Sequence, residues 1–201
     1  MEADLWEGIH RSKEEAEASW FEARPQVSLD LIAATGIGPD AAIVDVGGGA
    51  SRLVDCLLGQ GFRRITVLDL SEAALAKARA RLPGDAPVEW VVANVLRWQP
   101  SGGFDVWHDR ATFHFLTEAA DQDTYLKVMD RALLAGGHAV IGTFAPGGPA
   151  SCSGLPVVRY DAAVLAQRLG PGYLLRRSLM HDHRTPRGRV QRFHFGLFQK
   201  I

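Results

Sequence analysis

Glycines and polar residues stand where three predicted strands end, in a spacing that suits a nucleoside ligand. The triplet Gly47-Gly48-Gly49 directly follows the apolar run 41–46. Glycine lets the backbone turn sharply and come close to a ligand, and a helix that begins there offers free N–H groups. Asp69 lies 20 residues after Gly49 and ends the next apolar run, and Asn94 follows a third. A carboxylate at that spacing can accept hydrogen bonds from a ribose diol, and an amide can pair with the amino group of adenine.

Asp45 makes this crevice unlike a dinucleotide site. A carboxylate just before the glycines can hold an ammonium group, and it would repel a pyrophosphate. The dinucleotide fingerprint also has a third glycine three positions after the second, where this chain has Arg52. The pattern therefore favours S-adenosylmethionine (SAM), which carries an amino acid in place of phosphates, and leaves a NAD(P)-dependent oxidoreductase as an alternative.

The segment after the predicted strand 104–107 contains the residues best placed for chemistry. Methyl transfer is an in-line displacement, in which the protein orients the nucleophile and, where necessary, removes its proton. Asp109 can bind the amino group of the cofactor or orient a histidine. His108 and His114 can act as bases near pH 7, and a structural role between two phenylalanines is the alternative for His114. Arg110 can pair with a substrate carboxylate or with a structural acid.

The remaining histidines and the two cysteines do not form a metal motif. His181 and His183 share one face of a predicted strand, and His194 lies across the hairpin, with no carboxylate partner evident in the sequence. Cys56 and Cys152 provide neither a disulfide framework nor a zinc cluster. We therefore expect no metal and assign structural roles to these histidines.

Alternating apolar runs and helical stretches must position these residues. Strands are predicted at 41–46, 65–68, 88–92, 104–107 and 138–143, and helical segments at 12–23, 26–34, 51–59, 72–82, 121–134 and 161–169. Such alternation indicates βαβ units and a parallel sheet. Two final runs, 173–183 and 190–199, flank the turn Pro186-Arg187-Gly188 and must therefore pair antiparallel. The prediction is an α/β fold with a Rossmann-like, seven-stranded, mostly parallel sheet, helices on both faces and a C-terminal antiparallel hairpin.

Over roughly residues 20 to 200 the chain resembles the class I SAM-dependent methyltransferases. The segments that resemble family motifs are Val44-Asp45-Val46-Gly47-Gly48-Gly49, Val67-Leu68-Asp69-Leu70-Ser71, Ala93-Asn94-Val95 and Leu134-Ala135-Gly136-Gly137. The resemblance implies that SAM is the cofactor. It implies a cofactor site formed by Gly47 and Gly49 at the methionine part, Asp69 and Leu70 at the ribose, and Asn94 and Val95 at the adenine, together with Trp20, Asp45 and Asp109.

Two further resemblances concern the methyl acceptor. Ser19-Trp20-Phe21 is similar to an N-terminal element of a subgroup that includes protein-lysine methyltransferases, in which aromatic residues cover the cofactor. Asp109-Arg110-Ala111 is similar to the strand exit of thiol-methylating, thiopurine-type enzymes. The chain lacks the Asn/Asp-Pro-Pro-Tyr/Phe signature of enzymes that methylate amino groups of bases or glutamine. We expect a small-molecule acceptor; a protein-lysine methyltransferase and a non-catalytic SAM-binding protein are alternatives.

Length and composition fit one globular domain. The chain has 201 residues, 47% hydrophobic residues and a net charge of −1. We expect a single methyltransferase domain, 1–201, with an N-terminal helical cap, 1–38, and a Rossmann-like core, 39–201. The near-neutral charge gives no reason to expect nucleic acid as a partner, and an acidic N-terminus without a long apolar run predicts a cytoplasmic protein that does not enter membranes. The acceptor atom and the oligomeric state stay open.

Overall fold

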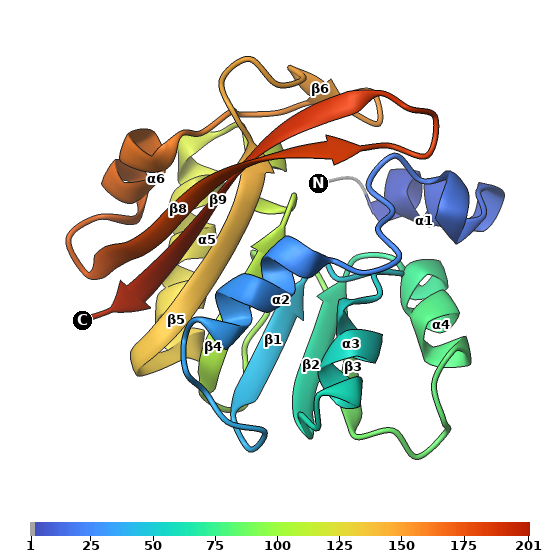
Figure 1. The fold of residues 1–201 in the computed structure, drawn as a ribbon, viewed down its shortest axis with the longest axis horizontal. Coiled ribbons are helices and arrows are strands. Elements are labelled where there is room, and N and C mark those ends of the chain that lie inside the picture. The colour runs from blue at the N-terminus through green and yellow to red at the C-terminus, as the bar shows by residue number, and fades with distance from the viewer. Residues whose placement is uncertain (1–2) are drawn as a thin grey trace.

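A single seven-stranded sheet forms the centre of the protein in a computed structural model that describes residues 3–201 (Figure 1). Its strands are β1 Ala42–Val46, β2 Arg64–Asp69, β3 Val88–Val92, β4 Phe104–Arg110, β5 Leu133–Phe144, β8 Tyr173–Arg184 and β9 Val190–Lys200. The order across the sheet is β3-β2-β1-β4-β5-β9-β8. Strands β1 to β5 pair parallel, and β9 lies antiparallel between β5 and β8. The predicted fold class, including the C-terminal hairpin, is confirmed.

Helices cover both faces of this sheet, which explains why β1 at its centre is apolar except for Asp45. One face is covered by α2 Gln26–Ala33, α3 Leu53–Gly59 and α4 Glu72–Ala80, and the other by α5 Ala119–Ala132 and α6 Ala162–Leu169 (Figure 1). Leu29, Leu53 and Leu75 enter one apolar cluster, and Tyr125 and Leu165 enter the other. A parallel sheet that is buried on both faces requires near-continuous apolar strands, and all five residues of β1 are buried.

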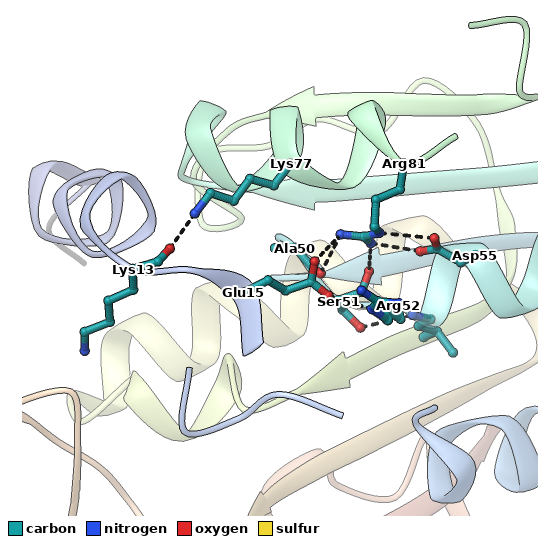
Figure 2. A network of polar contacts seen from close by, with 9 residues as sticks. Lys13, Glu15, Ala50, Ser51, Arg52, Asp55, Lys77 and Arg81 are labelled. Atoms are coloured by element: carbon teal, nitrogen blue, oxygen red, sulfur yellow. Dashed lines mark hydrogen bonds and ion pairs between the residues drawn. The ribbon is translucent and has the colours of Figure 1, made fainter. Parts of the chain in front are cut away.

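The N-terminal segment differs from its prediction. The helix α1 spans Ala3–Ser12 and is followed by a short 3₁₀ turn, η1 Glu15–Glu17, so the expected helix at 12–23 is wrong. Ion pairs explain the difference: the Glu15 carboxylate accepts from Arg52 Nε and Arg81 Nη1, each at 2.8 Å. Figure 2 shows this network, in which Arg81 also binds Asp55. These long-range contacts outweigh the helix propensity of the charged run.

Two boundaries later in the chain also differ. The strand β5 begins at Leu133, directly after α5, so Gly136 and Gly137 lie inside the strand, where a loop was expected. After β5 the chain forms a small hairpin, β6 Ser151–Cys152 and β7 Leu155–Pro156, which no pattern in the sequence indicated. Between residues 3 and 201, no helix has the length and apolar character that crossing a membrane requires.

Candidate functional site

A pocket opens at the carboxyl ends of β1, β2 and β4, where an open α/β sheet binds its ligands. About 990 Å³ of space lies between its walls, open solvent at the mouth included. Most of the site residues expected from the sequence line this pocket: Trp20, Asp45, Gly47, Gly49, Asp69, Leu70, Val95 and His108. Three others, Asn94, Asp109 and His114, are not among its lining residues.

The glycine loop passes directly beside the Asp69 carboxylate. The N–H groups of Gly47 and Gly48 donate to Leu68 O at 2.7 and 3.2 Å, which fixes the loop against β2. At Gly49, where φ is +48°, an added Cβ would lie 3.0 Å from Asp69 Oδ2. A side chain at that position would fill the gap between loop and carboxylate. The backbone and Asp69 Oδ2 therefore form one continuous polar surface for a ligand.

Asp69 is a carboxyl group whose protonation changes near neutral pH. Burial raises its pKa to about 6, and the negative charges of Asp45 and Glu7 act in the same direction. Backbone N–H groups oppose this shift, including that of Ser71, which donates to Asp69 Oδ1 at 2.8 Å. The group is thus mostly ionised at pH 7 and protonated below about pH 6.

Asp45 is held in the pocket wall by a buried chain of hydrogen bonds. Its Oδ1 lies 2.7 Å from His108 Nδ1, and His108 Nε2 lies 2.8 Å from Ser28 Oγ. Because a carboxylate only accepts, Nδ1 carries a proton in this arrangement. Both ring nitrogens of His108 are therefore engaged with protein groups. The geometry fixes His108 as the residue that orients Asp45 at the rim of the glycine loop.

Asp109 lies beneath the pocket, where it shapes the chain after β4. It is fully buried and accepts from the N–H groups of Thr112 and Phe113 at 2.8 and 3.0 Å and from the Tyr125 hydroxyl. Tyr125 in turn accepts from Trp107 Nε1 at 2.8 Å. These bonds form the turn into the short 3₁₀ helix η2 Phe113–Phe115. Burial raises the pKa of Asp109 to about 6.

His114 is buried behind the aromatic wall of the pocket. Its Nδ1 accepts from Phe144 N–H at 3.2 Å, and its ring packs against Phe115 and Phe144 at centroid distances of 4.5 and 4.8 Å. Burial, assisted by the Arg110 charge, lowers its pKa to about 3. The imidazole is therefore neutral at physiological pH. Its role as a base stays a prediction, and its neighbours Phe115 and Phe144 line the pocket directly.

Asn94 also acts on the backbone next to it. Its Oδ1 accepts from Leu96 N–H at 2.9 Å, which stabilises the turn after β3. Ala93 and Val95 on either side line the pocket. The prediction that Asn94 contacts adenine stays untested, and the turn that it forms places its two neighbours at the site.

An aromatic cover over the pocket was only partly foreseen. Trp20 was expected there, and α1 adds Trp6 and His10, which lie four residues apart on one helical face. The Trp6 ring lies 5.9 Å from Trp20 and 5.1 Å from Phe115. The four-residue spacing of Trp6 and His10 could have indicated this helical face, but both residues precede the segment 12–23 that was expected to be helical.

Glu7 attaches this cover to the core. Its Oε2 accepts from Ser71 Oγ at 2.7 Å and from Ala73 N–H at 3.1 Å. These hydrogen bonds lower the pKa of Glu7. A carboxylate at the start of a helix is also favoured by the helix dipole, so Glu7 anchors α1 at the N-terminus of α4.

The C-terminal histidines have a carboxylate partner that the sequence did not reveal. Glu22 Oε1 lies 3.2 Å from His183 Nδ1 and 3.7 Å from His181 Nε2. These atoms are near enough together to surround a cation. However, Glu22 Oε1 also lies 3.4 Å from Arg110 Nη2, whose charge already balances the carboxylate. The cluster therefore joins the N-terminal segment to β8 through an ion pair with Arg110 and polar contacts with the two histidines.

Comparisons with known proteins agree with this geometry. A family model described as a methyltransferase domain matches residues 43–137. The trans-aconitate 2-methyltransferase of Rhodopseudomonas palustris is 29% identical over 126 residues, which is 62% of this chain and 43% of that protein. The chain spans about half the length of the curated relatives that it matches. The matched regions cover 51% and 43% of the length of two of these proteins.

Solved structures show the same fold. The N-methyltransferase NodS of Bradyrhizobium japonicum, in complex with S-adenosyl-L-homocysteine (SAH), is 16% identical with a TM-score of 0.75, and 98% of each chain is covered. A Burkholderia thailandensis 1,6-didemethyltoxoflavin-N1-methyltransferase is 22% identical with a TM-score of 0.75, covering 99% of this chain and 84% of that one. Residues 43–137 thus match a methyltransferase domain, and the whole chain has the fold of the class I S-adenosylmethionine-dependent methyltransferases.

Proposed function

We propose that the chain transfers the methyl group of SAM to a small molecule. SAM is the cofactor of the family, and the pocket residues fit it. The observation that carries the proposal is the juxtaposition of the glycine loop with two carboxylates, Asp45 at its start and Asp69 beside Gly49. A backbone surface between two acids suits a ligand with an ammonium group at one end and a ribose diol at the other.

Each part of the cofactor has residues that would hold it. The methionine part would lie along Gly47 and Gly49 near Asp45, the ribose at Asp69 and Leu70, and the adenine at Val95. When bound, SAM supplies a methyl group on a positively charged sulfur that is a good leaving group. The protein then has to orient the acceptor and exclude water, and the aromatic cover from Trp6, Trp20 and Phe115 does both. In this proposal residues 1–38 form a cap on the core 39–201.

A small acceptor is supported by the relatives and by the pocket. The names of the trans-aconitate and didemethyltoxoflavin enzymes give small molecules as their substrates. In this chain the space beyond the glycine loop is enclosed by α1, β5, β9 and the β6–β7 hairpin through Trp6, Phe144, Phe193 and Cys152. Such walls suit an acceptor of limited size.

An assay with tritium-labelled SAM tests the proposal. The purified chain would be incubated with pools of thiols, small carboxylates and other metabolites and, in parallel, with peptide pools. We expect label in small-molecule fractions together with formation of SAH. Label in peptides alone would contradict the small-molecule acceptor. SAM binding without any labelled product across both pools would favour the non-catalytic alternative.

Asp69→Ala should weaken SAM binding by about 1–3 kcal/mol, because the ribose hydroxyls lose a charged acceptor. The affinity of the wild type should also fall as the pH drops below about 6, since protonation of Asp69 removes that acceptor. Calorimetric titration between pH 5 and 8 measures both effects, with Asp69→Asn as the control that cannot titrate. Unchanged affinity of a folded Asp69→Ala protein would refute the ribose assignment.

His114→Ala should lower turnover and leave SAM affinity nearly intact. The imidazole supports Phe115 and Phe144 from behind, so its loss lets both pocket walls shift. With a pKa of about 3 it does not titrate near neutrality, and the pH profile of kcat between 6 and 8 should keep its shape in the variant. If the variant instead loses an inflection near pH 6.5, His114 is itself the base. Equal loss of turnover and SAM affinity would contradict both roles.

A further inference from the structure

Arg110 is a buried cation on the pocket wall with two unused donors. Its Nη1 donates to Trp20 O at 2.9 Å. Its Nε and Nη2 are buried and have no hydrogen-bond partner within residues 3–201. The nearest acid, Glu22, lies 3.4 Å from Nη2 without the geometry of a hydrogen bond. Buried donors are almost always satisfied in folded proteins, so this pair points to an acceptor that is not part of the chain.

The two free donors have the arrangement that a carboxylate requires. Nε–H and the adjacent Nη2–H lie on one edge of the planar guanidinium and point in the same direction. That edge binds the two oxygens of a carboxylate through parallel hydrogen bonds. A neutral carbonyl offers only one oxygen to this edge, so a carboxylate is the better fit.

Aromatic side chains flank Arg110 on the pocket wall. Its guanidinium lies over the Phe193 ring of β9, 5.2 Å from the centroid, and Cys152 of the β6–β7 hairpin lines the same pocket. Phe144, packed 4.8 Å from Phe193, continues this wall. Flat aromatic faces therefore flank Arg110 in the same pocket that Asp69 and the glycine loop line.

The charges around Arg110 leave it able to bind an anion. Asp45, the other acid nearby, is hydrogen-bonded to His108. Glu22 is shared between Arg110, His181 and His183, all of which approach its Oε1. Neither acid forms a hydrogen bond with the Nε–Nη2 edge, and an incoming carboxylate would share the Arg110 charge with Glu22, 3.4 Å from Nη2.

We propose that Arg110 anchors the carboxylate of the methyl acceptor, and that the acceptor is a planar, apolar acid seated beside Arg110 and the rings of Phe144 and Phe193. This inference rests on the proposed function and names the substrate class of the same site. Arg110 orients the acceptor through its carboxylate, which leaves a different atom of the acceptor to receive the methyl group.

Calorimetric titration of the SAH-loaded protein with benzoate tests this proposal, and benzamide serves as the neutral probe of equal shape. We expect benzoate to bind at least about tenfold more tightly than benzamide. Arg110→Lys keeps the charge and removes the two-pronged edge, so it should weaken benzoate by about tenfold and leave benzamide unchanged. Arg192→Lys, at an exposed ion pair with Asp182, is the matched control and should leave both probes unchanged.

Further titrations distinguish a carboxylate of the acceptor from the carboxylate of the cofactor. SAH carries a carboxylate, whereas 5′-methylthioadenosine has none. Because Arg110 is assigned to the acceptor, Arg110→Lys should bind both ligands with the same affinity as the wild type. A loss of SAH affinity alone would overturn the proposal, because Arg110 would then bind the cofactor. Equal binding of benzoate and benzamide would overturn it too. Failure of the wild type to bind SAH would instead overturn the proposed function. Arg110→Gln replaces the lysine variant if thermal melting shows that the latter is unfolded.

Discussion

Gly47→Val should abolish SAM binding, with a loss of affinity of more than about a hundredfold. Gly47 has φ of +67°, a backbone conformation that a β-branched residue rarely adopts. A Cβ at this position would lie 1.9 Å from Thr112 Oγ1. Thr112 cannot easily move away, because its hydroxyl donates to Val46 O at 3.1 Å and its N–H donates to Asp109. The loop must therefore shift out of the position that brings its backbone to the ligand.

Calorimetric titration with SAM measures this effect, and Gly36→Val is the matched control. Gly36 has a similar φ of +77°, but an added Cβ there meets no atom within 4 Å. Gly36→Val therefore introduces the same backbone strain without a clash, and residue 36 does not line the pocket. We expect it to lose some stability and to keep its SAM affinity. A folded Gly47→Val protein that binds SAM normally would mean that the cofactor loop lies elsewhere.

Asp109→Ala should destabilise the fold by about 3 kcal/mol or more, because three donors, two of them buried, lose their acceptor. These donors are the N–H groups of Thr112 and Phe113 and the hydroxyl of Tyr125. These hydrogen bonds stabilise the turn that places Thr112 against Gly47 and places Phe115 in the pocket wall. SAM affinity should therefore fall as well.

Urea unfolding of the wild type, Asp109→Ala and Asp109→Asn provides the measurement. The asparagine variant keeps one acceptor oxygen and nearly the same volume, so it should lose less stability than the alanine variant. If Asp109→Ala unfolds at the same urea concentration as the wild type and only turnover falls, Asp109 acts directly on the ligands.

The sheet was predictable because its signals are local. The run before Gly47, the next one ending at Asp69 and the C-terminal turn at Pro186-Arg187-Gly188 each constrain their own segment, and the rules of chain connection then fix the parallel core and the antiparallel end. By contrast, α1 and η1 depend on ion pairs between Glu15 and two arginines far along the chain. No local pattern in residues 12–23 contains that information.

The site divides in the same way. Asp45, the glycine loop and Asp69 follow from strand ends, and they line one pocket. The direction in which each side chain points does not follow from residue type, because successive residues of a strand face opposite sides of the sheet. His108 and Arg110 face the pocket, whereas Asp109 between them points into the opposite core with Tyr125. The pairing of Glu22 with His183, which joins segments 161 positions apart, was equally hidden.

Titration calorimetry of the purified chain with SAM and SAH tests most directly whether this pocket binds SAM. We expect micromolar binding of both ligands with one site per chain, which corresponds to about 8 kcal/mol of binding free energy. NADP serves as the control and should not bind. A well-folded protein that binds neither SAM nor SAH, or that binds NADP in their place, would contradict this account.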